Sequence, residues 1–393
     1  MNKKPVKLLL LGATGSIGTQ TLDVLQAHPD DFELVGISAG KNKAALESIL
    51  AQFPSVKAAG LSAQDETIRE DANGVVWYGG EKQMVHMVEE LDYDLLVNAV
   101  VGFRGLAPTL AAIERDKDVA LANKESLVCG GELVQDALKK HDAVLRPIDS
   151  EHSAIWQCLQ GNRHEDVSRL IITASGGSLR DLGREELADI IPERALKHPS
   201  WSMGPRITID SATMVNKGFE VIEAHYLFDM PYEQIATVLH PQSIVHSIVE
   251  YQDGASIAQL GSADMRLPIQ YALYGPDRPY LKEEHPLDLT RTLTLNFKEM
   301  DHDRYPMLLL AVQAGKRGGN AGCIFNAADE QAVDLFLKKK ISFLEIEEAI
   351  ADALEQIPFI ENPDLNDLFD TDARTRAHVK ARWCGQNASG PLD

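Results

Sequence analysis

The sequence predicts an α/β protein with a doubly wound N-terminal domain, an α+β domain after it and a small C-terminal helical bundle. Three observations indicate this fold class. A continuous apolar run, Val6 to Leu11, leads directly into a glycine-rich turn and a helical pattern. Apolar strands and helical stretches alternate up to residue 149, as in a parallel sheet covered on both faces. Beyond residue 305 the apolar spacing is that of helices alone.

The composition excludes several classes of function. The formal net charge of −21 argues against nucleic acid or an anionic membrane surface as a partner, because both bind basic surfaces. Four cysteines lie far apart without a CxxC pair, which is typical of reduced thiols in a cytoplasmic protein. The apolar run at residues 8–11 is too short for a signal peptide or a membrane span. We therefore expect a cytoplasmic protein, with several domains because 393 residues exceed one hydrophobic core.

Residues 12–18, with the sequence GATGSIG, join the first strand to a helical pattern that runs through Leu25. Glycines at such a turn let the backbone approach a pyrophosphate, and the helix N-terminus attracts the anion, so the segment predicts a dinucleotide site. The second strand, Phe32 to Ser38, ends without the acidic residue usual in NAD-binding proteins. Residues 39–43, Ala-Gly-Lys-Asn-Lys, fit the 2′-phosphate of NADP instead, although these lysines would also suit the start of a solvated helix.

Polar residues follow two of the later strands. Further strands are expected at residues 56–61, 74–78, 94–101, 118–122 and 143–147. Asn98 and Gly102 lie near the end of one of them, and residues 123–126, Asn-Lys-Glu-Ser, follow another. The Lys-Glu pair is either a surface ion pair or part of a ligand site. Its place at the carboxyl end of a buried strand favours the ligand site, because ligands bind at that edge of a parallel sheet.

Residues 146–152, Arg-Pro-Ile-Asp-Ser-Glu-His, contain a candidate metal site. Asp149 and Glu151 stand two residues apart at a predicted strand-to-helix turn, and Ser150 between them adds a hydroxyl. Carboxylates in this place suit a hard divalent cation. Asp, Ser and Glu are also ordinary residues at a helix start, which is the alternative. A third carboxylate in a polar cluster downstream, Glu220, favours the metal site.

That downstream cluster lies on a helix that is expected to begin near Ser211 and to run to about residue 228. Asn216 and Glu220 are four residues apart and share one helix face, with Lys217 beside them. Near the helix start, backbone N–H groups and the helix dipole would favour an anion. Each residue singly would also suit a solvated face or a cap. Together they predict phosphate donors at the start of the helix and a metal carboxylate further along.

Two loops of the middle domain are candidates for ligand contacts. Residues 174–178, Ala-Ser-Gly-Gly-Ser, follow a strand predicted at 170–173 and are either a phosphate cradle or a plain glycine turn. Residues 198–205, with the sequence HPSWSMGP, suggest a loop that folds over a ligand, with a surface turn holding one buried Trp as the alternative. An Asp-Gly hairpin is expected at residues 252–254, and His246 before it is expected to be an interior histidine.

The C-terminal part is expected to serve packing and to complete the cleft. The polar stretch at residues 287–303 has no clear periodicity, and helices are expected after it at residues 305–315, 328–339, 342–356 and 364–383. No acid, base and nucleophile gather there. The predicted division is a nucleotide-binding domain at 1–149, a catalytic domain at 150–285, a linker at 286–304 and a helical domain at 305–393.

Seven sequence blocks spread over nearly the whole chain closely resemble those of the 1-deoxy-D-xylulose 5-phosphate reductoisomerase family. The blocks are GATGSIG (12–18), LANKESLV (121–128), DSEH (149–152), HPSWSMG (198–204), DSATMVNKGFEVIEAH (210–225), HPQSIVHSIVEYQDG (240–254) and FNAADE (325–330). The resemblance implies a homodimer with a Rossmann-like NADPH domain. The implied reaction converts this phosphorylated ketose, through a rearranged aldehyde, to 2-C-methyl-D-erythritol 4-phosphate with NADPH and Mg²⁺ or Mn²⁺, with Co²⁺ as a further option.

The resemblance also implies a role for individual residues. The implied metal ligands are Asp149, Glu151 and Glu220, which form the catalytic set together with Lys124. The residues implied to contact the sugar phosphate are Lys124, Ser150, Glu151, Ser175, His198, Trp201, Met203, Ser211, Asn216, Lys217 and Glu220. Those implied to contact NADPH are Thr14, Gly15, Ser16, Ile17, Gly40, Lys41, Asn42, Asn123, Glu125 and Gly204.

The chain departs from the family pattern at three places. Ser178-Leu179 stands where Pro-Phe is common, Ala263 stands where Pro is usual, and Asp329 replaces a usual Asn. None of these residues is an implied ligand contact, and the first departure is expected to loosen the loop near the phosphate.

Two other functions would also use an NADP-binding domain. A metal-independent NADP-linked dehydrogenase of the semialdehyde or homoserine type also combines a nucleotide domain with a second domain, but it would not explain three carboxylates. A non-catalytic NADP-binding regulator would keep its ligand in the presence of a chelator and would turn over no substrate.

Overall fold

The computed structural model describes residues 4–197, 203–282 and 286–384. The chain divides into two compact units. The first comprises Met1–Ser126, Leu133–Ser153 and Asp264–Glu284, and the second comprises Leu127–Glu132, Ala154–Ala263 and His285–Asp393. No helix of the described residues has the length and apolar character needed to cross a membrane.

The first unit contains an eight-stranded sheet with the order β4-β5-β3-β2-β1-β6-β7-β8. Its strands are β1 (Val6–Leu11), β2 (Phe32–Ala39), β3 (Ala58–Leu61), β4 (Ile68–Glu70), β5 (Val76–Gly79), β6 (Leu95–Asn98), β7 (Asp118–Leu121) and β8 (Leu145–Pro147). Every strand pair is parallel except β4 with β5. The chain builds the sheet outward from β1 in one direction and then in the other, which confirms the predicted doubly wound fold.

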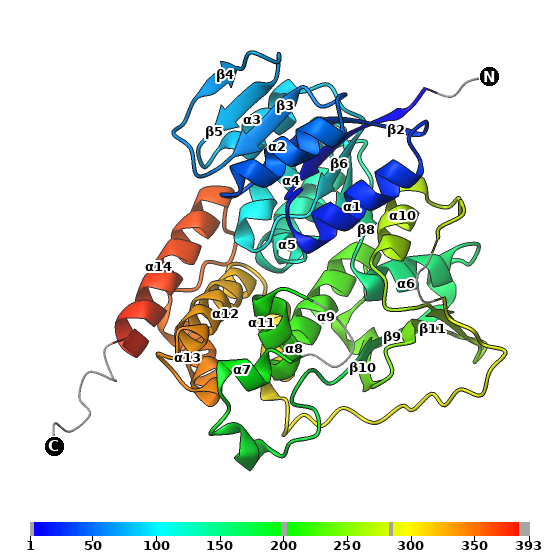
Figure 1. The fold of residues 1–393 in the computed structure, drawn as a ribbon. Coiled ribbons are helices and arrows are strands. Elements are labelled where there is room, and N and C mark those ends of the chain that lie inside the picture. The colour runs from blue at the N-terminus through cyan, green and yellow to red at the C-terminus, as the bar shows by residue number, and fades with distance from the viewer. Residues whose placement is uncertain (1–3, 198–202, 283–285, 385–393) are drawn as a thin grey trace. The chain divides into compact units, whose positions relative to one another are not determined.

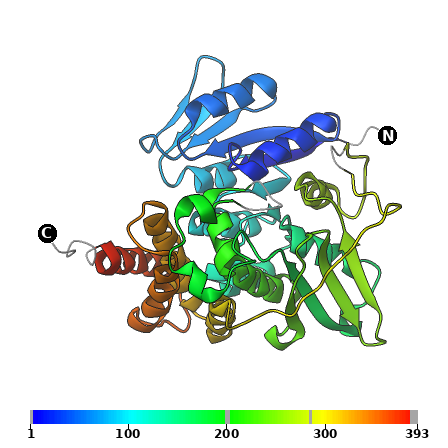
Figure 2. The ribbon, with the colours of Figure 1, turned by 60° about the horizontal axis from the view of Figure 1, so that its bottom comes forward.

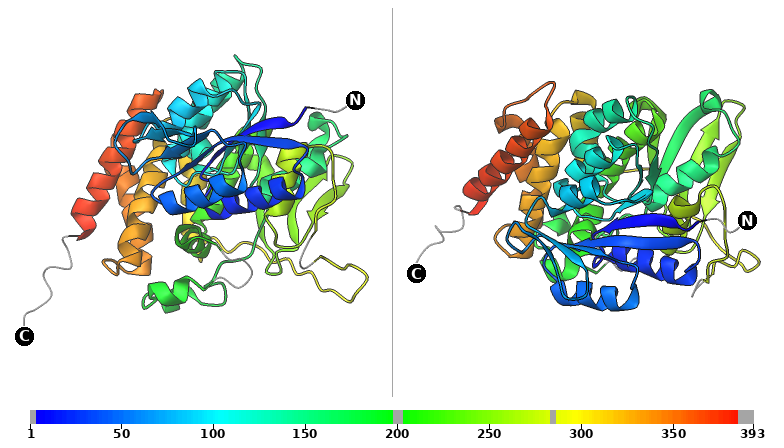
Figure 3. Two further views of the ribbon diagram at one scale, coloured as in Figure 1. Left: turned by 45° about the horizontal axis from the view of Figure 1, so that its top comes forward. Right: turned by 90° about the horizontal axis from the view of Figure 1, so that it is seen from above.

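Helices cover both faces of this sheet, as the left view of Figure 3 shows. One face packs against α1 (Ser16–Ala27) and α2 (Lys43–Gln52), because Leu8 and Leu10 of β1 point to that side. The other face carries the second set of helices. This set comprises α3 (Gln83–Glu90), η1 (Phe103–Gly105) and α4 (Leu106–Ile113). The strands are apolar on both sides for this reason.

One helix joins the first unit from a distant part of the sequence. Residues 264–284, which the predicted boundaries assign to the catalytic domain, contain α10 (Arg266–Tyr274), and this helix packs against α1. The Tyr274 hydroxyl donates to an Asp31 carboxylate oxygen over 2.6 Å, and Ile269 lies in the core below the sheet. Domain boundaries predicted as consecutive ranges cannot include a later segment, such as this one, that returns to the first unit.

The second unit contains a four-stranded sheet with the order β10-β9-β11-β12. Its strands are β9 (Val167–Ala174), β10 (Ile235–Leu239), β11 (Val245–Tyr251) and β12 (Ser256–Leu260). Strands β11 and β12 form the predicted antiparallel hairpin. Helices α6 (Ser150–Leu159) and α9 (Val215–Phe228) share one core cluster with this sheet. In Figures 1 and 2, α8 (Pro205–Thr213), α9 and α11 (Pro306–Arg317) lie between the sheet and the C-terminal helices.

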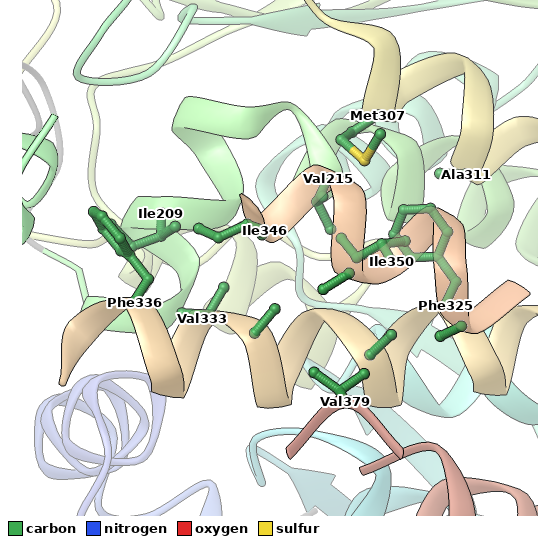
Figure 4. Packing of buried hydrophobic residues seen from close by; sticks show 14 of the residues in the cluster. Ile209, Val215, Met307, Ala311, Phe325, Val333, Phe336, Ile346, Ile350 and Val379 are labelled. Carbon is green, nitrogen blue, oxygen red and sulfur yellow. The ribbon is translucent and has the colours of Figure 1, made fainter. Parts of the chain in front are cut away.

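The C-terminal helices pack around α12, which is buried along most of its length. The remaining helices of this unit are η2 (His164–Asp166), η3 (Arg184–Leu187), α7 (Pro192–Ala195), η4 (Tyr232–Gln234), α11 (Pro306–Arg317), α12 (Ala321–Leu337), α13 (Phe343–Gln356) and α14 (Leu365–Cys384). Figure 4 shows side chains of α8, α9, α11, α13 and α14 meeting those of α12. Helix α12 begins earlier than its predicted start at residue 328, because its first two turns are buried on all sides and show no amphipathic period.

Candidate active site

The glycine turn after β1 is shaped by close backbone contacts. Gly12 has φ +82°, and a Cβ atom there would lie 2.4 Å from the Ala99 carbonyl oxygen. A Cβ atom on Gly18 would lie 2.2 Å from the carbonyl oxygen of Gly12. Gly15 and Ser16, at the N-terminus of α1, are exposed to solvent. The N-terminus of α1 is thus accessible from solvent, as the predicted dinucleotide site requires, while the Gly15 N–H donates within the turn to the Gly12 carbonyl oxygen over 3.0 Å.

The residues after β2 were predicted either to bind the 2′-phosphate of NADP or to begin a solvated helix, and the structure contains a candidate for each role. The Asn42 side chain accepts a hydrogen bond from Ala45 N at 3.0 Å and caps α2. Lys43 is the first residue of α2, with its ammonium 3.7 Å from Glu47 and 5.2 Å from the centre of the Trp77 ring. Lys43 therefore suits the helix-start alternative. Lys41 is exposed ahead of the helix and stays the candidate for a 2′-phosphate.

The residues after β7 are buried and do not form a surface ion pair. The Asn123 amide donates to the carbonyl oxygens of Val100 and Gly102, each over 2.8 Å. Glu125 accepts a hydrogen bond from Gly102 N at 3.0 Å and is 9% exposed. Together they join the loop after β6 to the loop after β7. Their predicted contact with NADPH stays a prediction.

Lys124 and Asp149 come from two neighbouring parallel strands. Strand β7 ends shortly before Lys124, and β8 ends shortly before Asp149, so both lie at the carboxyl edge of the sheet. The Lys124 ammonium lies 2.5 Å from a carboxylate oxygen of Asp149, and the two side chains are only 10% and 13% exposed. In the next turn the Ser150 hydroxyl donates to Glu151. This group combines two carboxylates, an ammonium and a hydroxyl at the edge where ligands bind.

Ser211 does not lie at a helix start, so this part of the prediction is wrong. Pro205 begins α8, and Met214, in the left-handed conformation with φ +65°, separates α8 from α9. Ser211 is in the last turn of α8, where its hydroxyl donates to the Ile207 carbonyl oxygen over 2.8 Å. The helix begins earlier than expected because Pro205 stands at its first position, where a proline favours a helix.

Helix α9 brings three of the predicted residues together. Glu220 is 1% exposed and accepts hydrogen bonds from the Asn216 amide, over 2.5 Å, and from the Lys217 ammonium. Lys217 is 4% exposed, so the pair is buried and its carboxylate has a charged partner. Asn216 and Glu220 therefore lie on one face of α9, as expected from their spacing.

The Ser175 loop approaches the last turn of α8. Gly176 and Gly177 have φ +90° and φ +71°, which residues with a side chain rarely adopt. A Cβ atom on Gly177 would lie 2.6 Å from the Ser211 carbonyl oxygen and 2.7 Å from Ala212 Cα. The two serines therefore come from distant parts of the sequence to adjoining turns. Both are half-buried, which leaves them accessible to a small ligand.

The helix that starts in the Asp149 motif also packs against α9. Ile155 of α6 lies in the same core cluster as Val221 of α9. Glu151 is one helical turn before Ile155, and Glu220 directly precedes Val221. Two sets of described residues could hold a metal ion, with all ligand atoms of a set within 4.8 Å of one another, and they are Asp149, Glu151 and Glu220, and Asp149, His152 and Glu223.

The first of these sets contains only carboxylates, which are the donors that Mg²⁺ and Mn²⁺ prefer. The second set contains two residues that the sequence prediction did not select, His152 and Glu223. His152 ends the Asp149 motif, and Glu223 lies one turn beyond Glu220, so helical spacing was a signal for both.

The structure describes only some of the remaining predicted residues. His198 and Trp201 lie outside the described residues. Met203 is half-buried and Gly204 exposed, immediately before α8. His246 is 7% exposed, as expected of an interior histidine.

Comparison with known proteins is consistent along the whole chain. Profiles of 1-deoxy-D-xylulose 5-phosphate reductoisomerase match residues 8–131, and those of its C-terminal domains match residues 145–228 and 260–378. The enzyme of that name from Geobacillus kaustophilus is 53% identical over 374 residues, covering 95% of this chain and 98% of the relative. The one from Geobacillus sp. (strain WCH70) is 50% identical with the same coverage.

Solved structures agree with the sequence relatives. The Zymomonas mobilis enzyme in complex with NADPH has a TM-score of 0.87 and 39% identity, covering 97% of this chain and 100% of that one. A DOX-P reductoisomerase in complex with NADPH, fosmidomycin and magnesium has a TM-score of 0.90 and 34% identity, covering 98% of this chain and 100% of that one. The chain belongs to the 1-deoxy-D-xylulose 5-phosphate reductoisomerase family.

Proposed function

We propose that this protein converts 1-deoxy-D-xylulose 5-phosphate to 2-C-methyl-D-erythritol 4-phosphate, a step in the formation of isoprenoid precursors, with NADPH and a divalent cation. One observation carries the proposal. Three carboxylates from two segments far apart in sequence have their ligand atoms within 4.8 Å of one another, in a chain about half identical to enzymes of that name.

The N-terminal unit fits NADPH. The turn at residues 12–18 can pack this closely on the backbone of Ala99 and on itself only because Gly12 and Gly18 lack side chains, as in turns that bind a pyrophosphate. Thr14, Gly15, Ser16 and Ile17 form the turn and the start of α1 that are proposed to contact the pyrophosphate, and Lys41 suits the 2′-phosphate. The Gly15 N–H itself donates to the Gly12 carbonyl oxygen over 3.0 Å and so serves the shape of the turn. NADPH supplies the hydride that reduces the rearranged aldehyde. Asn123 and Glu125 hold the adjoining loops in place through the hydrogen bonds described above.

The carboxylate set fits a hard divalent cation. Three ionised carboxylates this close would repel one another by about 3 kcal/mol per pair at an effective dielectric near 20, so the site favours a cation. A bound Mg²⁺ or Mn²⁺ supplies Lewis acidity to a carbonyl and to the hydroxyl beside it. Lys124 and Ser150 lie beside Asp149 and Glu151, where they orient the hydroxyl and carbonyl end of the sugar.

The phosphate end is assigned to the second unit. Ser175, Ser211 and Asn216 are half-buried and offer hydroxyl and amide donors, and Lys217 offers a buried positive charge. Met203, His198 and Trp201 belong to the segment before α8, which is proposed to exclude water from the bound sugar. Excluding water protects the reactive aldehyde until it is reduced.

The rival dehydrogenase reading is not favoured. A metal-independent enzyme has no use for three converging carboxylates, and related structures were solved with magnesium. A regulator without catalysis would leave the same feature unexplained.

We also propose a homodimer in the cytoplasm. Strand β12 lies at an edge of its sheet and exposes Ile257 at 40%, and such an edge is a ready site for a second copy. All four cysteines are free thiols, three of them buried, as expected in a reducing compartment. Sedimentation of the purified protein would test the dimer.

NADPH oxidation with 1-deoxy-D-xylulose 5-phosphate, measured with and without EDTA, tests the function. We expect turnover that EDTA abolishes and that added Mg²⁺ or Mn²⁺ restores. Turnover that survives EDTA would support the rival dehydrogenase chemistry, and NADPH binding without any turnover would support a regulator.

A further inference from the structure

The loop that carries Ser175 is held by side chains that sequence reasoning did not select. Arg304 Nε donates to the Leu182 carbonyl oxygen over 2.9 Å, and its Nη2 donates to that of Leu179 over 3.0 Å. Arg180 Nη1 donates to the carbonyl oxygen of Ser175 itself over 3.2 Å. The hydroxyl of the residue after Arg304, Tyr305, donates to the Gly176 carbonyl oxygen over 3.4 Å.

Four carbonyl oxygens of residues 175–182 are thus engaged by side-chain donors. A carbonyl oxygen carries partial negative charge and repels a phosphate, whereas a backbone N–H attracts one. A loop that binds an anion therefore needs its carbonyl groups engaged by donors of the protein. The two arginines and Tyr305 meet this requirement for the Ser175 loop.

Arg304 also places a positive charge near the loop. It is 9% exposed, and among the described residues its guanidinium forms no ion pair with a carboxylate, although its backbone N–H donates to Asp301. Burial lowers the pKa of this guanidinium, which still stays charged at neutral pH. Its neighbours are the two carbonyl oxygens and the Tyr305 ring, 4.6 Å from the guanidinium carbon. Glu347 and Asp301 act on this charge electrostatically but form no ion pair with the guanidinium, so the buried cation favours a further anion nearby.

The position of Arg304 ties this loop to α9. Arg304 N donates to a carboxylate oxygen of Asp301 over 2.9 Å, in the turn that begins α11. Helix α11 packs so closely on α9 that a Cβ atom on Gly218 would lie 2.3 Å from the Ala311 Cβ. Gly218 directly follows Lys217. The start of α11 therefore links the loop of Ser175 to the helix that carries the phosphate-binding lysine.

We propose that Arg304 is the positioning residue of the phosphate site: it orients the loop of Ser175 and supplies positive potential to a bound phosphomonoester without touching it. This inference rests on the proposed function. It also bears on the expected loosening of the loop at Ser178-Leu179, because Leu179 is one of the two residues whose carbonyl groups Arg304 holds, and the Ser178 hydroxyl donates to the Ala195 carbonyl oxygen.

The test compares Arg304→Met with Arg304→Lys in the full-length protein. For Arg304→Met we expect KM for 1-deoxy-D-xylulose 5-phosphate to rise at least about tenfold, with kcat falling less than about threefold. The Kd for inorganic phosphate, measured by calorimetry, should rise by a similar factor, while the Kd for NADPH stays unchanged. Arg304→Lys keeps the charge but not both hydrogen bonds, so it should recover part of the phosphate affinity.

Arg184→Met is the matched control. Arg184 lies shortly after the same loop and pairs with Glu347 of α13, with an Nη2 to carboxylate distance of 2.5 Å, but it contacts none of the four carbonyl groups. We expect its phosphate affinity to equal that of the parent protein. If Arg304→Met does not fold, Arg180→Met, which changes a partly exposed side chain, should show the same selective loss of phosphate affinity.

Unchanged phosphate affinity in the Arg304 and Arg180 variants would overturn the proposal, as would equal losses of phosphate and NADPH affinity, which indicate a general structural role. The phosphate measurement does not depend on turnover. A parent protein that binds phosphate but fails to oxidise NADPH with the sugar would refute the proposed function and leave the role of Arg304 still measurable.

Discussion

Replacing Glu220 by Gln isolates the charge of the most buried member of the carboxylate set. Glutamine keeps the shape of the side chain and an oxygen for Asn216 and Lys217, but it removes the negative charge. The side chain is 1% exposed, so solvent cannot compensate for the loss. The variant leaves the ammonium of Lys217, itself 4% exposed, without its carboxylate.

Two effects of different size follow. Removing one partner of a buried ion pair costs about 3 kcal/mol of unfolding free energy, so the metal-free variant should unfold at lower denaturant. Losing one of three ligands to the cation should lower kcat at least about a hundredfold, which corresponds to about 2.7 kcal/mol of transition-state stabilisation. The variant should also need more Mg²⁺ for half-maximal rate, because one carboxylate no longer attracts the ion.

The assay is the rate of NADPH oxidation as a function of Mg²⁺, together with urea unfolding in EDTA. Glu250→Gln is the control, because it removes one negative charge from an exposed ion pair with Arg169. A Glu220→Gln protein with the parent's kcat and the parent's Mg²⁺ dependence would refute the metal role of this residue. Reduced stability with normal catalysis would show that the residue serves the fold alone.

Three further outcomes are expected. Lys217→Ala should raise KM for the sugar phosphate about tenfold or more in the NADPH assay, and an unchanged KM would remove this lysine from the phosphate site. Gly177→Ala should lower phosphate affinity and cost about 2 kcal/mol of unfolding free energy, measured by calorimetry and urea unfolding, because φ is +71° and the new Cβ would lie 2.6 Å from a backbone oxygen of α8. Glu330→Gln should cost about 3 kcal/mol at pH 7 and less at an acidic pH below the folded-state pKa of Glu330. Burial alone would raise the pKa of Glu330, but Arg206 and Arg376 hold it below its ordinary value, so its stabilisation is present at neutral pH and is lost as the pH falls through the folded-state pKa. Urea unfolding at both pH values measures this, and equal losses at both would contradict it.

The features predicted correctly are those set by neighbours in sequence. Strand β1, the glycine turn and α1 follow one another within the first 27 residues, and their apolar and glycine positions are sufficient to predict them. The shared face of Asn216 and Glu220 follows from helical spacing alone. Both features can be predicted from neighbouring residues, without information about distant parts of the chain.

The features that were missed depend on contacts between distant segments. The placement of Ser211 depends on a helix break at Met214, a residue type that rarely adopts positive φ. Arg304 donates to carbonyl groups of residues more than a hundred positions earlier in the chain. Because every residue has a backbone carbonyl group, the residue types do not reveal which of them accept these hydrogen bonds. The return of α10 to the first unit is likewise a matter of tertiary packing.

The lysines beside the carboxylates have a consequence for ion selectivity. Asp149 already has the ammonium of Lys124 as counterion, and Glu220 has that of Lys217. A monovalent ion such as Na⁺ or K⁺ brings no more charge than the ammonium it would displace, so it gains nothing by competing. A divalent ion brings twice that charge and can engage all three carboxylates at once. On the proposed metal role, these lysines would favour divalent ions at the site over the much larger cellular pool of monovalent salt.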